Sequence, residues 1–180
     1  PDSRIFGAPR LSYDFDREAS CPLWQQALAG IFPQRLENDN RLFILQEFFG
    51  YCLMLKDHRF ATFLILFGNG KNGKSVVLDV LRAMLGNENV SNMPLDALGK
   101  EFRQENMIGK LANIATDMPR MQKAEEGLLK QFVSGEPCQI NRKHKDPITM
   151  YPTAKLIFAT NHLPSFSDSS EGLWRRMIIV

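Results

Sequence analysis

From Phe60 to the end of the chain, short apolar runs alternate with longer segments that have helical spacing. The runs predict strands at residues 63–67, 111–116, 155–160 and 177–180, with a short strand near Val90. The segments between them predict helices at residues 76–85, within 95–106 and at 124–133, and residues 138–151 have the pattern of a hairpin. Strands that alternate with helices are typical of a parallel sheet flanked by helices, so the predicted fold class is α/β.

The first third of the chain has a helical pattern instead. Residues 1 to about 20 are irregular, and the segment after them predicts a helix that Pro33 ends. Asn40 is a candidate N-cap of a second helix. The apolar face of that helix would hold Leu42, Phe43, Leu45, Phe48 and Phe49 and reach Leu53 and Met54. We therefore divide the chain into a small helical N-terminal region, residues 1–58, and an α/β core, residues 59–180.

The loop after the first core strand carries the clearest chemical motif. Residues 68–75 read Gly-Asn-Gly-Lys-Asn-Gly-Lys-Ser and match the phosphate-binding P-loop, G-x-x-x-x-G-K-[ST], at every position. Its glycines let backbone N–H groups close around phosphate, and the helix N-terminus adds a positive dipole end. Lys74 would reach the β- and γ-phosphates, and Ser75 would hold Mg²⁺. The candidate phosphate-binding residues are Gly68, Asn69, Gly70, Lys71, Asn72, Gly73, Lys74, Ser75 and Val76.

Two polar residues directly follow predicted strands. In P-loop NTPases an acid at a strand end holds Mg²⁺ opposite the P-loop hydroxyl, and Asp117 stands in such a place. Without the P-loop, an ordinary surface Asp would be the better interpretation. Asn161 could orient the attacking water or contact the γ-phosphate, although Asn is also favoured as a turn cap. His162 has weaker support, since a single His beside a loop is more often structural.

Positive charge gathers at the expected hairpin tip and again near the C-terminus. Residues 141–146 form the densest basic cluster, in which Arg142, Lys143 and Lys145 could contact phosphates; a solvated loop is an equally good interpretation. Arg175 and Arg176 precede the last predicted strand. Arginine there suits the developing charge on a transferring phosphoryl group, often across a subunit boundary, and the alternative is a surface pair beside a core Trp.

Composition narrows the class of protein. The 180 residues are 44% hydrophobic, as in a globular chain, and the formal net charge is only +2, so a nucleic-acid site must come from local clustering. Cys21, Cys52 and Cys138 are far apart, which argues against a disulfide framework and fits a reducing interior. No apolar run approaches the roughly 18 residues of a membrane span, and no signal peptide or initiator Met opens the sequence. We expect a cytoplasmic, non-secreted piece of a longer protein.

Together these features resemble a superfamily 3 helicase domain, a branch of the AAA+ ATPases, and more closely the phage and plasmid primase–helicases and the poxvirus-type primase helicases. The matching elements are the P-loop, Asp117, residues 130–136 (Lys-Gln-Phe-Val-Ser-Gly-Glu), residues 159–162 (Ala-Thr-Asn-His) and the triplet Trp174-Arg175-Arg176. The resemblance extends from about Leu11 to Val180.

The resemblance implies the cofactors ATP and Mg²⁺ and a homo-oligomeric ring, a hexamer in the full-length protein, that surrounds single-stranded DNA at a fork. Lys74 and Ser75 would be Walker A residues, Asp117 the Walker B acid and Asn161 the sensor. The turn at Lys143, His144 and Lys145 looks like the hairpin that tracks DNA, with Arg142 beside it. Arg176 best matches the arginine finger, and Arg175 is the alternative. A covalently linked primase domain is also implied as a possibility.

The chain departs from the family pattern beside Asp117. Many relatives carry two adjacent acids there, where this sequence has Thr116-Asp117, and no spacing argument supports Glu125 or Glu126 as the missing general base. The family's C-terminal lid is missing after the last predicted strand, which puts ring formation by this stretch in doubt. The leading hypothesis is an ATP-dependent DNA helicase domain of a phage, viral or mobile-element replication protein. A P-loop small-molecule kinase and a nucleotide-gated DNA-binding or loading module without unwinding remain alternatives.

Overall fold

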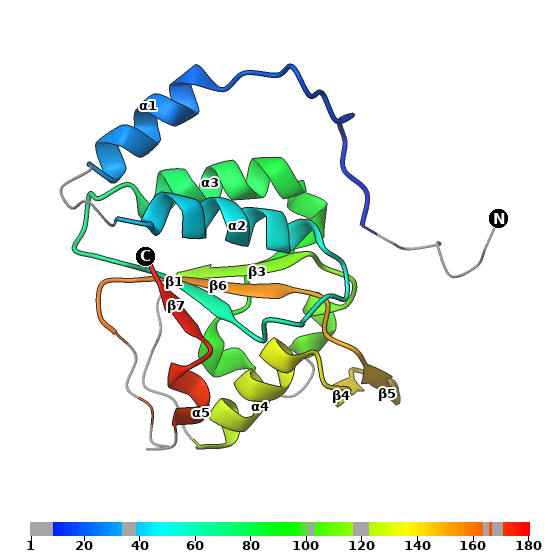
Figure 1. Ribbon diagram of the computed structural model, residues 1–180. Coiled ribbons are helices and arrows are strands. Elements are labelled where there is room, and N and C mark those ends of the chain that lie inside the picture. Colours follow the sequence, from blue (N-terminus) through cyan, green and yellow to red (C-terminus); the bar gives the residue numbers. More distant parts are fainter. Residues whose placement is uncertain are drawn as a thin grey trace.

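A parallel five-stranded sheet forms the centre of the molecule (Figure 1). The computed structural model describes residues 9–33, 39–98, 100, 103–116, 123–163, 166 and 171–180. The strands run in the order β2-β3-β6-β1-β7, and every described pairing between them is parallel. Their bounds are β1 Phe63–Phe67, β2 Val90–Ser91, β3 Ala112–Thr116, β6 Lys155–Thr160 and β7 Met177–Ile179. The predicted α/β fold with a parallel sheet is confirmed.

Helices cover both faces of this sheet. α2 (Arg41–Leu53) and α3 (Lys74–Leu85) lie over one face, and α4 (Lys123–Ser134) and the short α5 (Glu171–Trp174) lie over the other (Figure 1). α1 (Pro22–Ile31) lies outside α2 and α3, and it has no fully buried residue. The helical N-terminal region is therefore present, while its boundary at residue 58 stays a prediction.

Burial along the central strands explains this layering. In β1, Phe63 and Ile65 belong to the apolar cluster under α4 and the hairpin, and Leu64 and Leu66 belong to the cluster under α2 and α3. Successive strand residues point to opposite faces, so an unbroken apolar run can bury both of its sides. β6 is buried along its whole length in the same way. Such strands have to be central, and β1 and β6 are paired neighbours.

An antiparallel hairpin stands apart from the main sheet. It consists of β4 (Cys138–Arg142) and β5 (Lys145–Met150), joined by a turn at Lys143 and His144. In Figure 1 it lies beside the beginning of β6, at the end of the sheet away from the loop that joins β1 to α3. The predicted hairpin is confirmed, and the chain passes from it directly into β6.

Two predictions of local structure are wrong. Within residues 95–106 the described part of the chain forms the 3-10 helices η2 (Leu95–Ala97) and η3 (Gln104–Met107), with no α-helix; a further one, η1, spans Asn87–Asn89. The sequence has a glycine at position 99, which makes an α-helix through this segment about 1 kcal/mol less stable than alanine would. On α2, Phe43 is 67% exposed although its spacing placed it on the apolar face.

The described helices are all too short or too polar to cross a membrane.

Candidate nucleotide-binding site

The P-loop, residues 68–75, connects the end of β1 to the start of α3. Lys71 and Gly73 have left-handed backbone conformations, with φ of 64° and 85°. Gly73 occupies the N-cap position of α3, and a Cβ there would overlap the side chain of Ile31 at the end of α1. Glycine is required at this position because it has both the backbone freedom and the missing Cβ. The sharp turn directs the first N–H groups of α3 into the loop, as a phosphate site needs.

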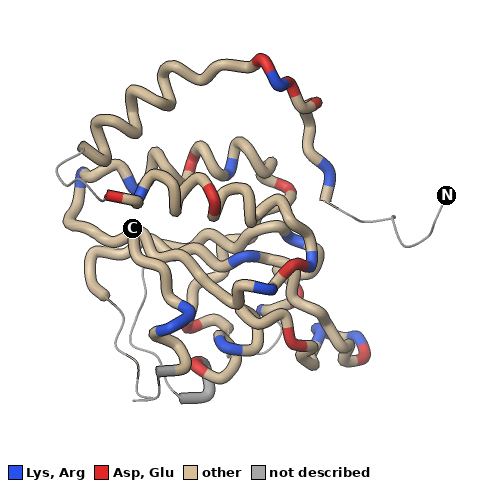
Figure 2. The backbone as a smooth tube through the Cα atoms, viewed as in Figure 1, with Lys and Arg blue, Asp and Glu red and all other residues tan. Residues whose placement is uncertain are grey.

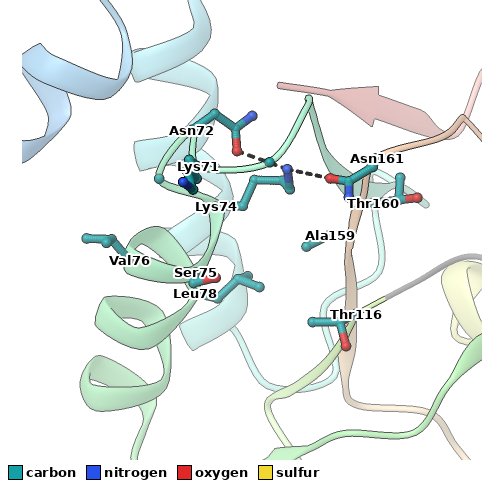
Figure 3. Close-up of a pocket in the computed structure, with 12 residues that line it drawn as sticks. Lys71, Asn72, Lys74, Ser75, Val76, Leu78, Thr116, Ala159, Thr160 and Asn161 are labelled. Atoms are coloured by element: carbon teal, nitrogen blue, oxygen red, sulfur yellow. Dashed lines mark hydrogen bonds between the residues drawn. The ribbon is translucent and has the colours of Figure 1, made fainter.

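A cavity of about 490 Å³ opens inside this loop. Its walls come from the P-loop, the first turn of α3 and the carboxyl ends of β3 and β6 (Figure 3). The lining residues are Gly70, Lys71, Asn72, Gly73, Lys74, Ser75, Val76, Leu78, Thr116, Ala159, Thr160 and Asn161. Most of the predicted phosphate-binding residues and the predicted sensor Asn161 are therefore brought together. Thr116, Ala159 and Thr160 join them because parallel strands end at the same edge of a sheet.

The ammonium group of Lys74 lies between two separate parts of this cavity. Its Nζ donates to the Gly68 carbonyl at 2.5 Å and to Asn72 Oδ1 at 2.9 Å, both within the P-loop. It also donates to Asn161 Oδ1, 3.0 Å away at the end of β6 (Figure 3). The ammonium group of Lys74 therefore links the P-loop to the end of β6 and lies at the wall of the cavity.

The metal-binding half of the prediction is described only in part. Ser75 lies in the first turn of α3 and Thr116 ends β3 on the other side of the cavity. Asp117 lies outside the described residues, so its role stays a prediction. The side chain of Glu126, one of the two candidate bases, is 2% exposed on α4 and does not line the cavity.

The two arginines near the C-terminus have different surroundings. Arg176, which the sequence favoured as the finger, donates from Nη1 to the Gly172 carbonyl at 2.6 Å and from Nη2 to Ser134 Oγ at 3.3 Å. Its Nε is buried without a partner among the described residues. Arg175 is exposed, and neither arginine lines the cavity. Arg176 is thus tied to the C-terminal end of α4, whereas Arg175 is open to solvent.

The four predicted DNA-binding residues of the hairpin tip also differ in their surroundings: one is bonded within the hairpin, and three are exposed. Arg142 folds back across the turn and donates from Nε and Nη2 to the Asp146 carbonyl at 3.1 and 3.0 Å. Lys143, His144 and Lys145 are exposed, and His144 holds a left-handed conformation with φ of 57°. Basic and acidic positions lie close together at this far end of the molecule (Figure 2). Arg142 therefore braces the turn, and the next three residues form its accessible surface.

Two polar side chains that sequence reasoning missed, one buried and one half-buried, lie at the amino end of the sheet. Lys155, at the start of β6, is 2% exposed. It donates to the Met54 and Thr153 carbonyls at 3.1 and 3.2 Å, and its ammonium lies 4.7 Å from the centre of the Tyr51 ring. Burial lowers the pKa of Lys155 from 10.5 to about 8, against the opposing effects of Cys52 and Asp57. This lysine joins the end of α2 to the sheet.

His58 holds the base of the hairpin. Its Nδ1 lies 3.1 Å from the Val133 carbonyl at the end of α4, and its Nε2 lies 2.9 Å from the Pro152 carbonyl just after β5. A neutral imidazole can donate to only one of two carbonyls. Burial, and next the charge of Lys155, lower the pKa of His58 below its ordinary 6.5 in spite of these acceptors. No motif announces His58, since both of its partners are backbone atoms.

Solved structures with this architecture include a protein that is a helicase by name, and two of them superpose on most of this chain. The C-terminal region of NrS-1 superposes with a TM-score of 0.65 at 18% identity, covering 89% of this chain and 38% of that one. JCV helicase superposes with a TM-score of 0.54 at 16% identity, covering 85% of this chain and 42% of that one. Likeness at such identities shows the fold. The chain therefore shares with these structures a parallel sheet that carries a phosphate loop at its carboxyl edge, flanked by helices.

Comparison of sequences gives the family. Residues 66–176, more than half of the chain, match the model of a family of unknown function, DUF5906, and the chain belongs to that family. A protein of Acanthamoeba polyphaga mimivirus named "Putative helicase L207/L206" is 25% identical over 129 residues, which cover 66% of this chain. The chain spans only 13% of that viral relative. The predicted resemblance to superfamily 3 helicases is confirmed at the level of a helicase-type domain.

Proposed function

We propose that this domain is the ATP-hydrolysing motor of a DNA helicase and that it moves along single-stranded DNA. The observation that carries the proposal is the position of Lys74, whose ammonium joins the P-loop to Asn161 on the neighbouring strand. A lysine held there can follow charge as it develops on a phosphoryl group, and an amide beside it can report which phosphate is present. The helicase-named viral relative and the helicase fold support the same class.

The residues of the cavity fit a nucleoside triphosphate. A left-handed glycine, the N-terminus of α3 and a lysine ammonium surround one space, and all three favour an anion. Ser75 would hold Mg²⁺ from α3, and Asp117 would hold it from the end of β3. A bound Mg²⁺ supplies charge neutralisation between the phosphates. Lys74 would exchange its contacts with Gly68 and Asn72 for phosphate oxygens while Asn161 stays beside them.

The hairpin tip gives the proposed motor its contact with DNA. Lys143, His144 and Lys145 are exposed at the far end of the molecule and would contact phosphates without reading sequence. β6 runs from the base of this hairpin to Asn161 at the nucleotide cavity. We propose that β6 carries the signal between the two, and that six copies of the full-length protein arrange their hairpins around one strand.

An arginine from a neighbouring subunit would complete each nucleotide site. Arg175 is the better placed of the two candidates because it is exposed, whereas Arg176 is bonded to Ser134 and Gly172 within its own subunit. Mixed oligomers test this assignment. Mixing Arg175→Ala subunits with Lys74→Ala subunits should restore ATPase activity that neither protein has alone, because the Lys74→Ala neighbour supplies Arg175 to the intact P-loop of the other subunit. Arg176→Ala subunits, which keep both the P-loop and the exposed Arg175, should be active without mixing.

The central experiment measures ATP hydrolysis with and without single-stranded DNA. The wild-type protein should be stimulated by DNA, and Lys74→Ala should reduce turnover by about 100-fold or more. Lys100→Ala is the matched control, since that lysine is exposed, pairs with Asp96 and does not line the nucleotide cavity. Asn161→Ala should lower kcat with a smaller change in KM. Turnover that ignores single-stranded DNA contradicts the proposal.

A nucleotide-gated DNA-binding or loading module is the second candidate. The observation that favours it is Thr116, which lines the cavity where many relatives of the resembling family carry a second acid. Such a module would bind DNA in response to ATP and would fail to separate a forked duplex. A strand-separation assay on a fork therefore distinguishes the two. A small-molecule kinase would leave the exposed basic tip without a role, and a strict monomer with ATP in sedimentation would favour it.

A further inference from the structure

The two faces of the β4–β5 hairpin differ in chemistry. Cys138, Ile140 and Met150 point into the core and are 4%, 2% and 4% exposed. The alternate residues point to solvent, because strand side chains alternate between faces. From the tip to the base of β5 these outward residues are Lys145, Pro147, Thr149 and, directly after the strand, Tyr151. The single acid of the hairpin, Asp146, falls on the other face by this alternation and is exposed beside Lys145 near the tip.

Tyr151 ends this outward row with an exposed ring. It is 63% exposed, a high value for an aromatic residue that directly follows the buried Met150. Among the described residues its phenol makes no hydrogen bond to the core, whose polar groups at this end are bonded to His58, Thr153 and Lys155. Lys145 and Tyr151 lie six positions apart in extended chain, which is roughly 20 Å. The row therefore has a cation at one end and an aromatic ring at the other.

A cavity of about 360 Å³ lies beside that ring, between the hairpin base and the link from α2 to β1. It is lined by Lys56, His58, Ser134, Gly135, Tyr151 and Pro152. The His58 ring closes against Gly135, where a Cβ would overlap it, and is held by its two carbonyl neighbours. Lys56 is exposed at the rim with a left-handed backbone, φ 60°. The cavity is thus lined by the fixed ring of His58, the exposed ring of Tyr151 and the cation of Lys56.

An aromatic ring beside a cation is the combination that holds single-stranded nucleic acid. Bases of any sequence can stack on an aromatic face, which contributes about 1–3 kcal/mol per base, while lysine contacts the backbone phosphate. A purely apolar partner would not need Lys56, and a free phosphate would not need Tyr151. The outward row from Lys145 to Tyr151 carries no acid, so nothing along it repels a phosphate backbone.

We propose that the cavity at the hairpin base is a second contact for single-stranded nucleic acid, in which a base stacks on Tyr151 and the adjoining phosphate meets Lys56. This inference rests on the proposed function and extends it from the hairpin tip to the whole outward face. The strand would run along β5 from Lys145 at the tip to Tyr151 at the base. His58 contacts backbone carbonyls at the end of α4 and at the hairpin base. Nucleic acid bound at this base would therefore lie against a part of the hairpin that is fixed to α4.

Binding of a fluorescent oligothymidylate, measured by anisotropy, tests the stacking contact. Tyr151→Ala should weaken binding by about 5- to 150-fold, the range that one stacked base gives. Tyr151→Phe should restore affinity to within about twofold, since the stacking face remains. Phe43→Ala is the matched control, because that ring is 67% exposed on α2 and does not line the cavity. An oligoribonucleotide arm shows whether the contact accepts both sugars.

An abasic oligonucleotide of the same length separates stacking from a general loss of structure. The wild type and Tyr151→Ala should bind it equally, because no base is left to stack. Lys56→Ala should lower the salt dependence of binding by a slope of about 0.7, while Tyr151→Ala should leave the slope unchanged. Equal binding of oligothymidylate by wild type and Tyr151→Ala overturns the inference, and so does an equal loss on the abasic probe.

The failure of this inference can be distinguished from failure of the proposed function. If Lys143→Ala weakens oligonucleotide binding and Tyr151→Ala does not, the tip contacts DNA and only the second contact is wrong. If the wild type binds no single-stranded oligonucleotide with or without ATP, both are wrong. Nucleotide affinity serves as the folding control for every variant, since Tyr151 and Lys56 lie outside the nucleotide cavity.

Discussion

The two ends of the central sheet carry polar chemistry of opposite kinds. At the carboxyl end, Lys74 and Asn161 line an open cavity, and their polar groups can exchange partners for a ligand. At the amino end, Lys155 and His58 are bonded to backbone carbonyls and hold elements together. The first end is available for chemistry, and the second is committed to structure.

This difference shows how one domain can be both responsive and rigid. A ligand-binding end needs groups whose contacts are replaceable, whereas an end that fixes the helices and the hairpin to the sheet needs contacts that are costly to break. β6 connects the two, because it begins with Lys155 and ends one residue before Asn161. Variants at each end should therefore affect different measurements.

Gly73→Ala should produce the largest effect, and only at the carboxyl end. The backbone φ of 85° disfavours any residue with a Cβ, and the new methyl group would overlap Ile31. We expect nucleotide affinity to fall by about 100-fold, or roughly 2.7 kcal/mol, measured by titration with a fluorescent nucleotide. The paired variant Ile31→Ala with Gly73→Ala should recover only part, because the φ strain remains. Full recovery would show that the contact with Ile31, and not the backbone, decides the loss.

Much of the fold and of the carboxyl end of the sheet could be predicted from sequence, because both depend on residues that are contiguous in the chain. The apolar runs of β1 and β6 are contiguous, and the P-loop is a continuous motif. Asn161 followed from its place at a strand end, which the pairing of β1 with β6 brings to the P-loop. The role of Asp117 remains a prediction.

The amino end could not be predicted because its partners carry no sequence signal. Lys155 and His58 bond to the carbonyl oxygens of four residues that any side chain could supply. A lysine within a strand indicates an edge or a surface more often than a core. Phe43 was misplaced for a related reason, since helical spacing identifies a face but not whether a neighbour covers it.

His58→Ala should break the amino end while leaving the carboxyl end intact. Removal of the ring leaves the Val133 and Pro152 carbonyls without their neighbour and opens a space beside Gly135, so we expect a loss of about 2 kcal/mol in the free energy of unfolding. Urea denaturation measures it. His162→Ala, an exposed residue at the other end, is the control and should change stability by less than about 0.5 kcal/mol.

The pH dependence of stability in the wild type and in His58→Ala tests the direction of the pKa shift at His58. The folded-state pKa of His58 lies below 6.5, so between that pKa and 6.5 the unfolded chain binds a proton that the folded chain does not. The wild type should therefore lose stability relative to His58→Ala as the pH falls from 7 to 5. Parallel curves for the two proteins would contradict the role of burial at this residue.

Lys155→Met tests the buried ammonium group, and the expected change in stability is about half of that for His58→Ala. The folded-state pKa is about 8 and the unfolded value about 10.5, so between these values the unfolded chain binds more protons and stability rises with pH. From pH 7 to 9 the wild type should gain about 1 kcal/mol relative to Lys155→Met in urea denaturation. Lys100→Met, at an exposed ion pair, should show no such divergence. Divergence in the opposite direction would mean that the ammonium is better solvated when folded.

His144→Gly should have the smallest effect, and its sign separates conformation from contact at the hairpin tip. With φ of 57°, His144 holds a conformation in which glycine is unstrained, so the variant should be more stable by about 0.5–1 kcal/mol in urea denaturation. His144→Asn, a residue that tolerates this conformation and keeps a polar side chain, should lie between the two. If the imidazole contacts a phosphate, His144→Gly should bind single-stranded DNA less tightly although it is more stable. If the residue matters only for the turn, affinity should stay unchanged or rise as the turn becomes less strained. Higher stability with weaker DNA binding would assign a DNA contact to the His144 side chain. Higher stability with equal or tighter binding would leave Lys143 and Lys145 as the proposed contacts of the tip.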